Sequence, residues 1–130
     1  MAADTDFIHV HPSLRGLSRV ELEAMRIEGD IQRHGVRGFE FYYPIGMVPT
    51  PADRARSLAP LWLPGRVFVG ETARWILRGG AAPDRVEIAR RTSRIPHLQR
   101  EQVRWYNRRI DRSRRQVIGD VEVSEVRLQR

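Results

Sequence analysis

The sequence contains no cysteine and no lysine. The missing cysteine excludes disulfides, thiolate metal sites and a cysteine nucleophile. No stretch approaches the roughly 18 apolar residues of a membrane span, so no membrane segment is expected. Residues 1–6 are acidic rather than basic and do not resemble the start of a secretory signal. With 130 residues, the expectation is a cytoplasmic protein of one domain or two very small ones.

All 23 basic residues are arginines, and they concentrate in the second half of the chain. Residues 1–60 hold seven arginines against eight acidic residues, a net charge of −1, whereas residues 61–130 hold sixteen against eight, a net charge of +8. Ten arginines lie within residues 90–115, where Glu101 and Asp111 are the only acidic residues. Such a segment attracts polyanions or an acidic protein surface. A genome preference for arginine codons also predicts many arginines, without any binding role.

Local signals in the first part of the chain predict a helix followed by a hairpin. Ser18 and Glu21 form a capping box that begins a helix over residues 19–28. Glycines between two β-prone runs indicate a hairpin that pairs residues 30–34 with residues 38–43. A helix followed by a glycine-turned hairpin is typical of the second half of a winged helix-turn-helix.

The second part of the chain predicts a mixture of helices and strands. Thr50 and Pro51 begin a helix that extends to about Ala59. Turn residues and alternation predict the next elements: a strand over 67–69, a helix over 70–77, a strand over 86–89, and a hairpin that pairs 117–118 with 121–123. The expected fold class is α+β, with a short winged-helix-like unit over 1–49 and a small basic α+β domain over 50–130.

Two segments allow alternative interpretations. Residues 7–11 alternate weakly before Pro12 and form either a short strand or an arm. Residues 98–112 fit either an arginine-covered amphipathic helix or a strand that contains Val103 and Trp105. Periodicity does not decide between the two.

The sequence contains no recognisable catalytic constellation. His9 and His11 would share one face of a strand, but no third ligand clusters with them, so a metal site is not expected. His34 and His97 have no motif around them. Phosphate-binding loops and nucleophile elbows are also absent. We therefore expect a protein that is not an enzyme, with no catalytic residue, metal or cofactor.

The arginine segment is the strongest functional signal. Trp105 and Tyr106 lie among Arg104, Arg108 and Arg109. Guanidinium groups bind phosphates with two hydrogen bonds, and aromatic rings stack on bases. This composition is typical of nucleic-acid binding, provided that folding gathers the arginines on one accessible surface without carboxylate neighbours. Otherwise the segment is a solvated face whose arginine stems cover the core.

Several motifs together resemble the AbiEi-type antitoxins of type IV toxin–antitoxin systems. They are Leu17-Ser18-Arg19-x-Glu21-Leu22, Gly29-x-Ile31-x-Arg33, Gly38-x-x-x-Tyr42, Arg54-Ala55-Arg56-Ser57-Leu58, Val67-Phe68-Val69-Gly70-Glu71-Thr72-Ala73-x-Trp75, Val86-Glu87-Ile88-Ala89-Arg90-Arg91, and Gly119-Asp120-Val121-x-Val123-Ser124 with Arg127. The resemblance covers roughly residues 15–127 and implies a non-enzymatic antitoxin that regulates its own transcription, in a shortened form. It implies DNA binding by the winged helix, neutralisation of a nucleotidyltransferase-like toxin by the second domain, and a strand rather than a helix over 102–110.

The expected interface follows from these observations. Arg19 and Arg26 would read sequence, while the hairpin arginines and the basic segment would contact phosphates. The expected nucleic-acid-binding residues are Arg19, Arg26, Arg33, Arg37, Arg90, Arg91, Arg104, Arg108, Arg109 and Arg112, with Trp105 and Tyr106 as stacking residues. The alternative is a protein-interaction module that docks its basic face on an acidic partner, such as the toxin, without nucleic-acid binding.

Overall fold

A computed structural model describes residues 9–90 and 102–129 of the chain. The N-terminal unit contains α1 (Arg19–Ile27) and a hairpin of β1 (Ile31–His34) and β2 (Phe41–Pro44). The predicted capping box is confirmed, because the Ser18 side chain accepts from the Glu21 amide and Glu21 from the Ser18 amide. The predicted hairpin is also confirmed, with antiparallel β1 and β2.

One residue before α1 extends this small sheet. Val10 forms an isolated parallel bridge with Tyr42 on β2, and Pro12–Leu14 then makes a single 3₁₀ turn. Residues 7 and 8 of the predicted strand or arm lie outside the described residues. The helix and hairpin match the predicted order, and the winged-helix assignment stays a prediction.

The second part of the chain is built on a five-stranded mixed sheet, which confirms the α+β class. Its strands are β3 (Arg66–Phe68), β4 (Val86–Arg90), β5 (Val103–Asn107), β6 (Gln116–Ile118) and β7 (Val121–Val123), in the spatial order β5-β4-β3-β7-β6. Neighbouring strands are antiparallel except for the β3–β7 and β4–β5 pairs, which are parallel. The predicted C-terminal hairpin is confirmed as β6 and β7.

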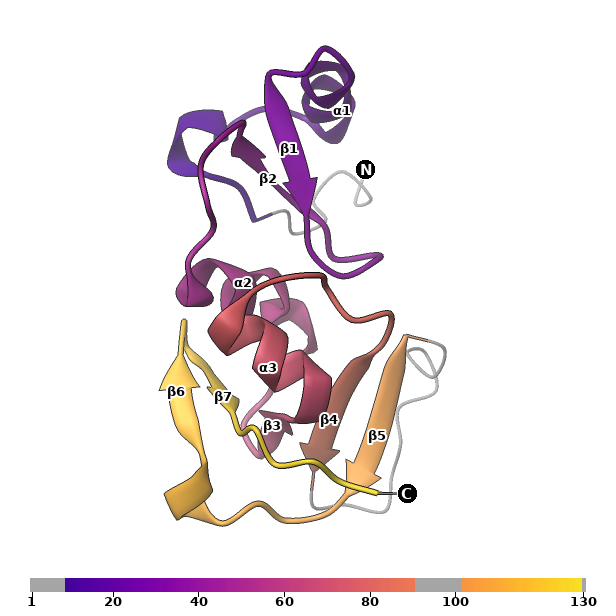
Figure 1. Ribbon diagram of the computed structural model, residues 1–130, viewed down its shortest axis with the longest axis vertical. Helices are drawn as coiled ribbons and strands as arrows, with labels where there is room; N and C mark the ends of the chain where they lie inside the picture. Colours follow the sequence, from indigo (N-terminus) through magenta and orange to yellow (C-terminus); the bar gives the residue numbers. More distant parts are fainter. Residues whose placement is uncertain (1–8, 91–101, 130) are drawn as a thin grey trace.

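Two helices pack against this sheet, α2 (Pro51–Ser57) and α3 (Gly70–Arg78) (Figure 1). The predicted helix from Thr50 is confirmed, although its last turn is a separate 3₁₀ turn at Ala59–Leu61. The helix over residues 70–77 is confirmed as α3. None of the helices in the described ranges has the length and apolar character needed to cross a bilayer.

The two units share one hydrophobic core. Val36, Phe41 and Tyr43 of the hairpin region belong to the same buried cluster as Phe68 and Ile88 of the sheet. Figure 1 shows the N-terminal unit stacked on the sheet domain along the long axis of the molecule. The predicted boundary between residues 49 and 50 therefore crosses a continuous packed interior.

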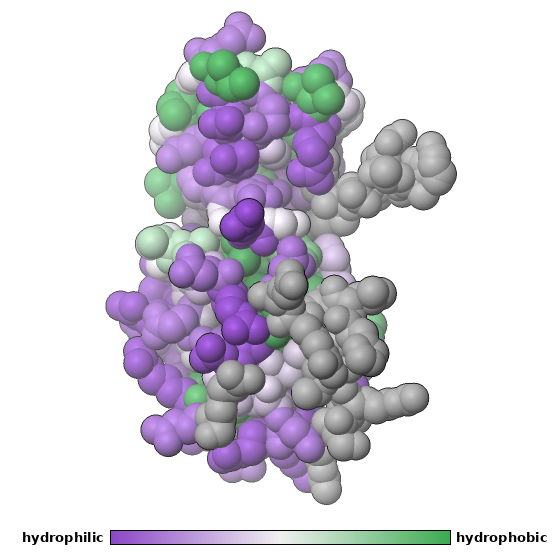
Figure 2. All heavy atoms as spheres, turned by 90° about the vertical axis from the view of Figure 1, so that its right-hand side faces the viewer, coloured by the Kyte–Doolittle hydropathy of each residue, from purple (hydrophilic) through white to green (hydrophobic). Residues whose placement is uncertain are grey.

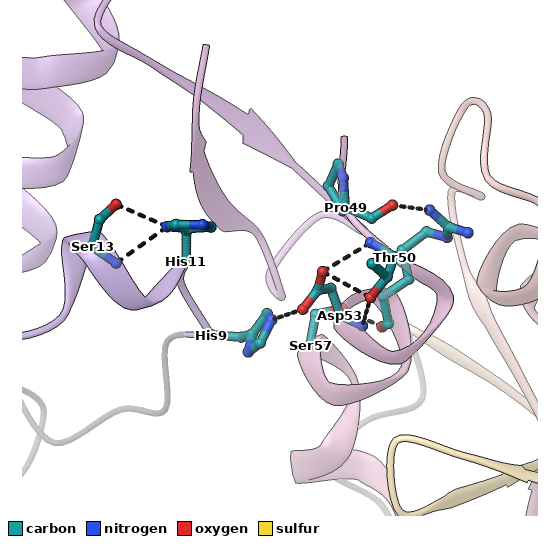
Figure 3. Close-up of polar contacts among 8 residues, drawn as sticks. His9, His11, Ser13, Pro49, Thr50, Asp53 and Ser57 are labelled. Carbon is teal, nitrogen blue, oxygen red and sulfur yellow. Dashed lines mark hydrogen bonds and ion pairs between the residues drawn. The ribbon is translucent and has the colours of Figure 1, made fainter. Parts of the chain in front are cut away.

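A carboxylate at the start of α2 ties the N-terminal segment to the second domain. Asp53 accepts hydrogen bonds from Thr50 N at 2.8 Å and Thr50 Oγ1 at 2.9 Å, and His9 Nε2 lies 3.3 Å from its Oδ1 (Figure 3). Burial acts to raise the pKa of Asp53, but hydrogen bonds from Tyr43, Thr50 and His9 outweigh it, so the pKa lies below the ordinary value. Asp53 therefore stabilises the fold most where it is ionised.

Replacing this carboxylate tests its contribution. Asp53→Asn is expected to lower the free energy of unfolding by about 1–2 kcal/mol at neutral pH, because an amide nitrogen cannot accept the bonds that an oxygen accepts. The folded-state pKa is depressed, so the stabilisation exists above the unfolded-state pKa and is lost as pH falls through the folded value. Urea titrations at several pH values should show the difference from the parent shrinking below about pH 4.

The control is Asp111→Asn, because Asp111 is exposed and its side chain makes no capping hydrogen bond. It should change stability little at any pH. A constant difference between Asp53→Asn and the parent from neutral to acid pH would contradict the account.

Candidate nucleic-acid interface

The edge strand β5 divides the predicted interface residues between two faces of the sheet. Its parallel pairing with β4 places Ile88 beside Trp105 and Ala89 beside Tyr106. Because side chains alternate along a strand, Val103 and Trp105 point into the main core, whereas Arg104 and Tyr106 lie on the other face. Within the segment 98–112, for which helix and strand were alternatives, residues 103–107 are thus a strand, which is shorter than the strand over 102–110 that the family resemblance implied.

Two arginines lie against the half-buried ring of Trp105. The guanidinium carbon of Arg66 lies 4.9 Å from the centre of the indole ring and that of Arg90 lies 5.4 Å from it. Burial is the main effect that lowers the pKa of Arg66, and the charge of Arg90 lowers it further. Arg66 Nη1 also donates to the Leu61 carbonyl at 2.7 Å. Trp105 therefore serves the protein itself as a cation–π platform, and a base that stacked on it would compete with these guanidiniums.

Tyr106 is buried and has a structural role. Only 5% of the residue is exposed, and its hydroxyl donates to Glu87 Oε1 at 2.9 Å. Burial and this hydrogen bond raise the pKa of Tyr106, against the opposing effect of Arg104. The other oxygen of Glu87 accepts the Glu71 amide at 2.9 Å and so caps the start of α3. The predicted stacking role of Tyr106 is therefore corrected, because its ring is enclosed in the protein.

The chain after β5 carries the exposed positive charge. We call residues 108–115 the basic loop; its arginines are Arg108, Arg109, Arg112, Arg114 and Arg115. All except the half-buried Arg115 are exposed, and Arg112–Arg114 form a 3₁₀ turn. Arg115 Nη1 pairs with Glu122 at 3.3 Å, whereas the other four make no ion pair with any described carboxylate.

A cavity of about 230 Å³ opens at the basic loop. Its wall is apolar where Val67, Ala89 and Ile110 meet, and Arg108, Arg109 and Arg115 line its rim. A guanidinium presents several N–H donors in one plane, which suits the oxygens of a phosphate group. The cavity could thus hold one phosphate group beside the guanidinium groups of Arg108, Arg109 and Arg115, next to an apolar wall.

Two of the arginines of the N-terminal unit, Arg26 and Arg33, share one carboxylate. Glu23 Oε1 lies 3.0 Å from Arg26 Nη2 and 3.5 Å from Arg33 Nη1, and the same carboxylate accepts from the Tyr42 hydroxyl. These hydrogen bonds, from Arg26 first, lower the pKa of Glu23. Arg19 and Arg37 are exposed and have no ion pair with a described carboxylate. The expected contacts of Arg26 and Arg33 with DNA would therefore have to displace Glu23.

The arginines that were expected to form one accessible surface are only partly brought together. Arg108, Arg109 and Arg112 lie together in the basic loop, and Arg104 lies on the same face of β5 as the cavity floor. Arg90 is on the opposite face with Trp105, and Arg91 lies outside the described residues. Figure 2 views the β5 side, where hydrophilic side chains cover much of the part of the sheet domain that is coloured by hydropathy.

Sequence reasoning missed Arg66 and Arg115 as neighbours of this site. Arg66 reaches Trp105 only because β3 pairs with β4 and β4 with β5, and no local spacing signals such a contact. Arg115 joins the cavity from the far end of the basic loop, although its position in the charged segment was visible in the sequence.

The two N-terminal histidines do not point toward a common ligand. Figure 3 shows His9 directed at Asp53 and His11 directed at Ser13. Within residues 9–90 and 102–129 no three His, Asp or Glu side chains form a group that could hold a metal ion.

Comparisons with protein-family models, with curated proteins and with solved structures gave no match to this chain.

Proposed function

We propose that this protein binds nucleic acid, and DNA in particular, through the basic loop and without catalysing a reaction. The observation that carries the proposal is the concentration of unpaired arginines in the basic loop. Arg108, Arg109, Arg112 and Arg114 are exposed within seven residues of chain and have no carboxylate partner among the described residues. Elsewhere some arginines contact carboxylates, as Arg78 does with Glu125 at 2.9 Å, and the exposed unpaired ones, Arg15, Arg19, Arg37 and Arg56, are spread along residues 15–56. Exposed, uncompensated guanidiniums are the groups that release counterions when they meet phosphates.

The binding mode that fits this arrangement is phosphate contact rather than base reading. Arg108 and Arg109 lie at the cavity rim, and Arg112 and Arg114 continue the positive surface along the 3₁₀ turn. Tyr106 is buried, and the half-buried ring of Trp105 already contacts two guanidinium groups. Binding would therefore depend strongly on salt and weakly on sequence, with any sequence reading left to Arg19 or Arg37 of the N-terminal unit.

A regulator of the AbiEi antitoxin type is the biological role that we propose for this binding. It rests on the resemblance of the motifs and on the order of helix, hairpin and α+β domain. In that role the protein works in the cytoplasm, and a nucleotidyltransferase-like toxin is its protein partner. Co-expression with the product of a neighbouring gene, followed by size-exclusion chromatography, tests this part separately.

A second candidate is docking on an acidic protein surface. The observation that favours it is Val117 on the edge strand β6, which is 69% exposed directly after the basic loop. An apolar side chain beside arginines is typical of protein interfaces. A protein with this function would ignore DNA and bind an acidic partner through the same loop.

A salt titration tests the primary proposal. Fluorescence anisotropy with a labelled duplex should give a log–log slope of about −4 to −5 against salt if about five phosphates are neutralised. Two duplexes of unrelated sequence should bind with similar affinity. Absence of binding at low salt would exclude the proposal and favour the acidic protein partner.

A further inference from the structure

A second and larger cavity lies where the N-terminal unit meets the sheet domain. Its volume is about 660 Å³, and its walls come from β1, from the chain around Met47, from α2 and from the end of α3. Cavities of this size are typical of small-molecule sites. The described residues that line it include Arg33, Arg54 and Arg78 but no Asp or Glu.

Arg54 supplies a buried positive charge to this cavity. The residue is only 8% exposed, and its Nε donates to the Ile76 carbonyl at 3.0 Å. Its Nη1 donates to the Pro49 carbonyl at 2.8 Å, and Figure 3 marks that contact at the labelled Pro49. A guanidinium has five N–H donors, so three remain without a partner in the part of the chain that the structure describes.

No described carboxylate compensates this charge directly. The adjacent Asp53 bonds to Thr50 and His9 instead. Burial lowers the pKa of Arg54, which reflects the cost of holding the cation there, although Asp53 acts in the opposite direction. A buried cation that has only carbonyl partners gains more than an exposed one when an anion reaches it.

The glycines after α3 give access to the guanidinium. A Cβ at Gly79 would lie 3.4 Å from Arg54 Nη1, and the φ of Gly79 is +81°, which favours glycine. The other two arginines of the cavity are already paired: Arg33 with Glu23 at 3.5 Å and Arg78 with Glu125 at 2.9 Å. The charge without a carboxylate partner is thus that of the buried Arg54.

Aromatic and apolar side chains complete the lining. Phe41 and Trp75 are almost fully buried, so neither ring faces a ligand. The half-buried ring of His34 stacks on Phe41 with ring centres 5.6 Å apart, and the side chain of Met47 is exposed. The surface that a ligand meets beside Arg54 therefore includes the flat ring of His34 and the side chain of Met47.

We propose that this cavity binds a small organic anion, namely a carboxylate or phosphate group joined to a flat apolar group. Arg54 holds the anionic group with its unused N–H donors, and the flat group lies against the ring of His34 and the side chain of Met47. This site is separate from the basic loop and does not depend on nucleic-acid binding.

Calorimetry with simple probes tests this proposal. Phenyl phosphate and benzoate represent the two sources of the anionic group, and at least one of them should bind about tenfold more tightly than inorganic phosphate and than benzyl alcohol. In NMR spectra of the unaltered chain, the bound probe should shift the resonances of His34 and Met47 but not those of His11. Equal binding of inorganic phosphate, or no saturation by either aromatic anion, would overturn the proposal.

Substitutions at two neighbouring alanines test whether the probe binds in the cavity. Ala82 lines the cavity, whereas the neighbouring Ala81 is exposed and does not. Ala82→Phe should weaken binding of the aromatic anion by at least about tenfold, and Ala81→Phe should leave it within about twofold. Unchanged binding by Ala82→Phe, or unchanged His34 resonances in the parent chain, would contradict the assignment. Arg108→Glu should leave anion binding intact, which separates this site from the basic loop.

Discussion

Reversing Arg108 and Arg109 to glutamate together is expected to weaken duplex binding by about 100-fold or more at about 100 mM salt. Both side chains are exposed, both line the cavity at the basic loop, and neither contacts a described carboxylate. The reversal removes two phosphate contacts and adds two like charges that repel phosphate. Fluorescence anisotropy measures the loss, and the salt slope should become shallower at the same time.

The control reverses two other exposed arginines, Arg15 and Arg56, which gives the same change in net charge. Neither has an ion pair with a described carboxylate, and both lie near enough to His9 to lower its pKa, an effect smaller than that of burial. The control should retain duplex binding within about threefold, because the lost charge is not at the interface. If both pairs weakened binding equally, total charge rather than the basic loop would carry the affinity.

A third variant distinguishes DNA binding by the basic loop from DNA binding by the N-terminal unit. Reversal of Arg19 and Arg37 should reduce affinity less than reversal of Arg108 and Arg109. The opposite order would move the DNA interface to α1 and its hairpin, as the winged-helix prediction requires.

Replacing Phe41 by alanine is expected to lower the free energy of unfolding of the whole chain by about 3–5 kcal/mol. The side chain is fully buried, and it joins the N-terminal hairpin to the core of the sheet domain. The loss should appear as one shifted transition in urea. It should also appear as faster amide exchange at Phe68 and Ile88, which belong to the other unit but share the cluster.

Val48→Ala serves as the control for this variant, because Val48 is 82% exposed on the same unit. It should change stability by less than about 0.5 kcal/mol. If Phe41→Ala accelerated exchange only in β1 and β2, the boundary predicted between residues 49 and 50 would separate two independently stable domains.

The helices and hairpins were predictable because their signals are local. The capping box at Ser18 and the Thr50-Pro51 helix start each lie within a few residues of chain, and the structure has a helix at both places. The order of strands was not predictable in this way. Phe68 on β3 pairs with Val123 on β7, and no pattern in the sequence marks those residues as partners.

The residue types of the candidate site were predictable from the sequence, but the face of the sheet on which each side chain lies was not. The sequence located the arginines and the aromatic pair, yet Trp105 and Tyr106 point to opposite faces once β5 joins β4. Tyr106 then meets Glu87, and Trp105 meets Arg66, each from a distant part of the chain. If residues 103–106 had been assigned to a strand, side-chain alternation would have placed Trp105 and Tyr106 on opposite faces. The sequence fitted both a helix and a strand there, so this argument could not be applied.

The position of β3 in the middle of the sheet has a consequence for synthesis on the ribosome. One of its neighbours, β4, follows soon after it, but the other, β7, is translated much later. Until Val123 emerges, the nascent chain presents Phe68 on a strand with one unpaired edge, a surface that invites association with other chains. Completion of the sheet is therefore a late event in translation, and prematurely terminated products that lack β7 are the species for which chaperones would be needed.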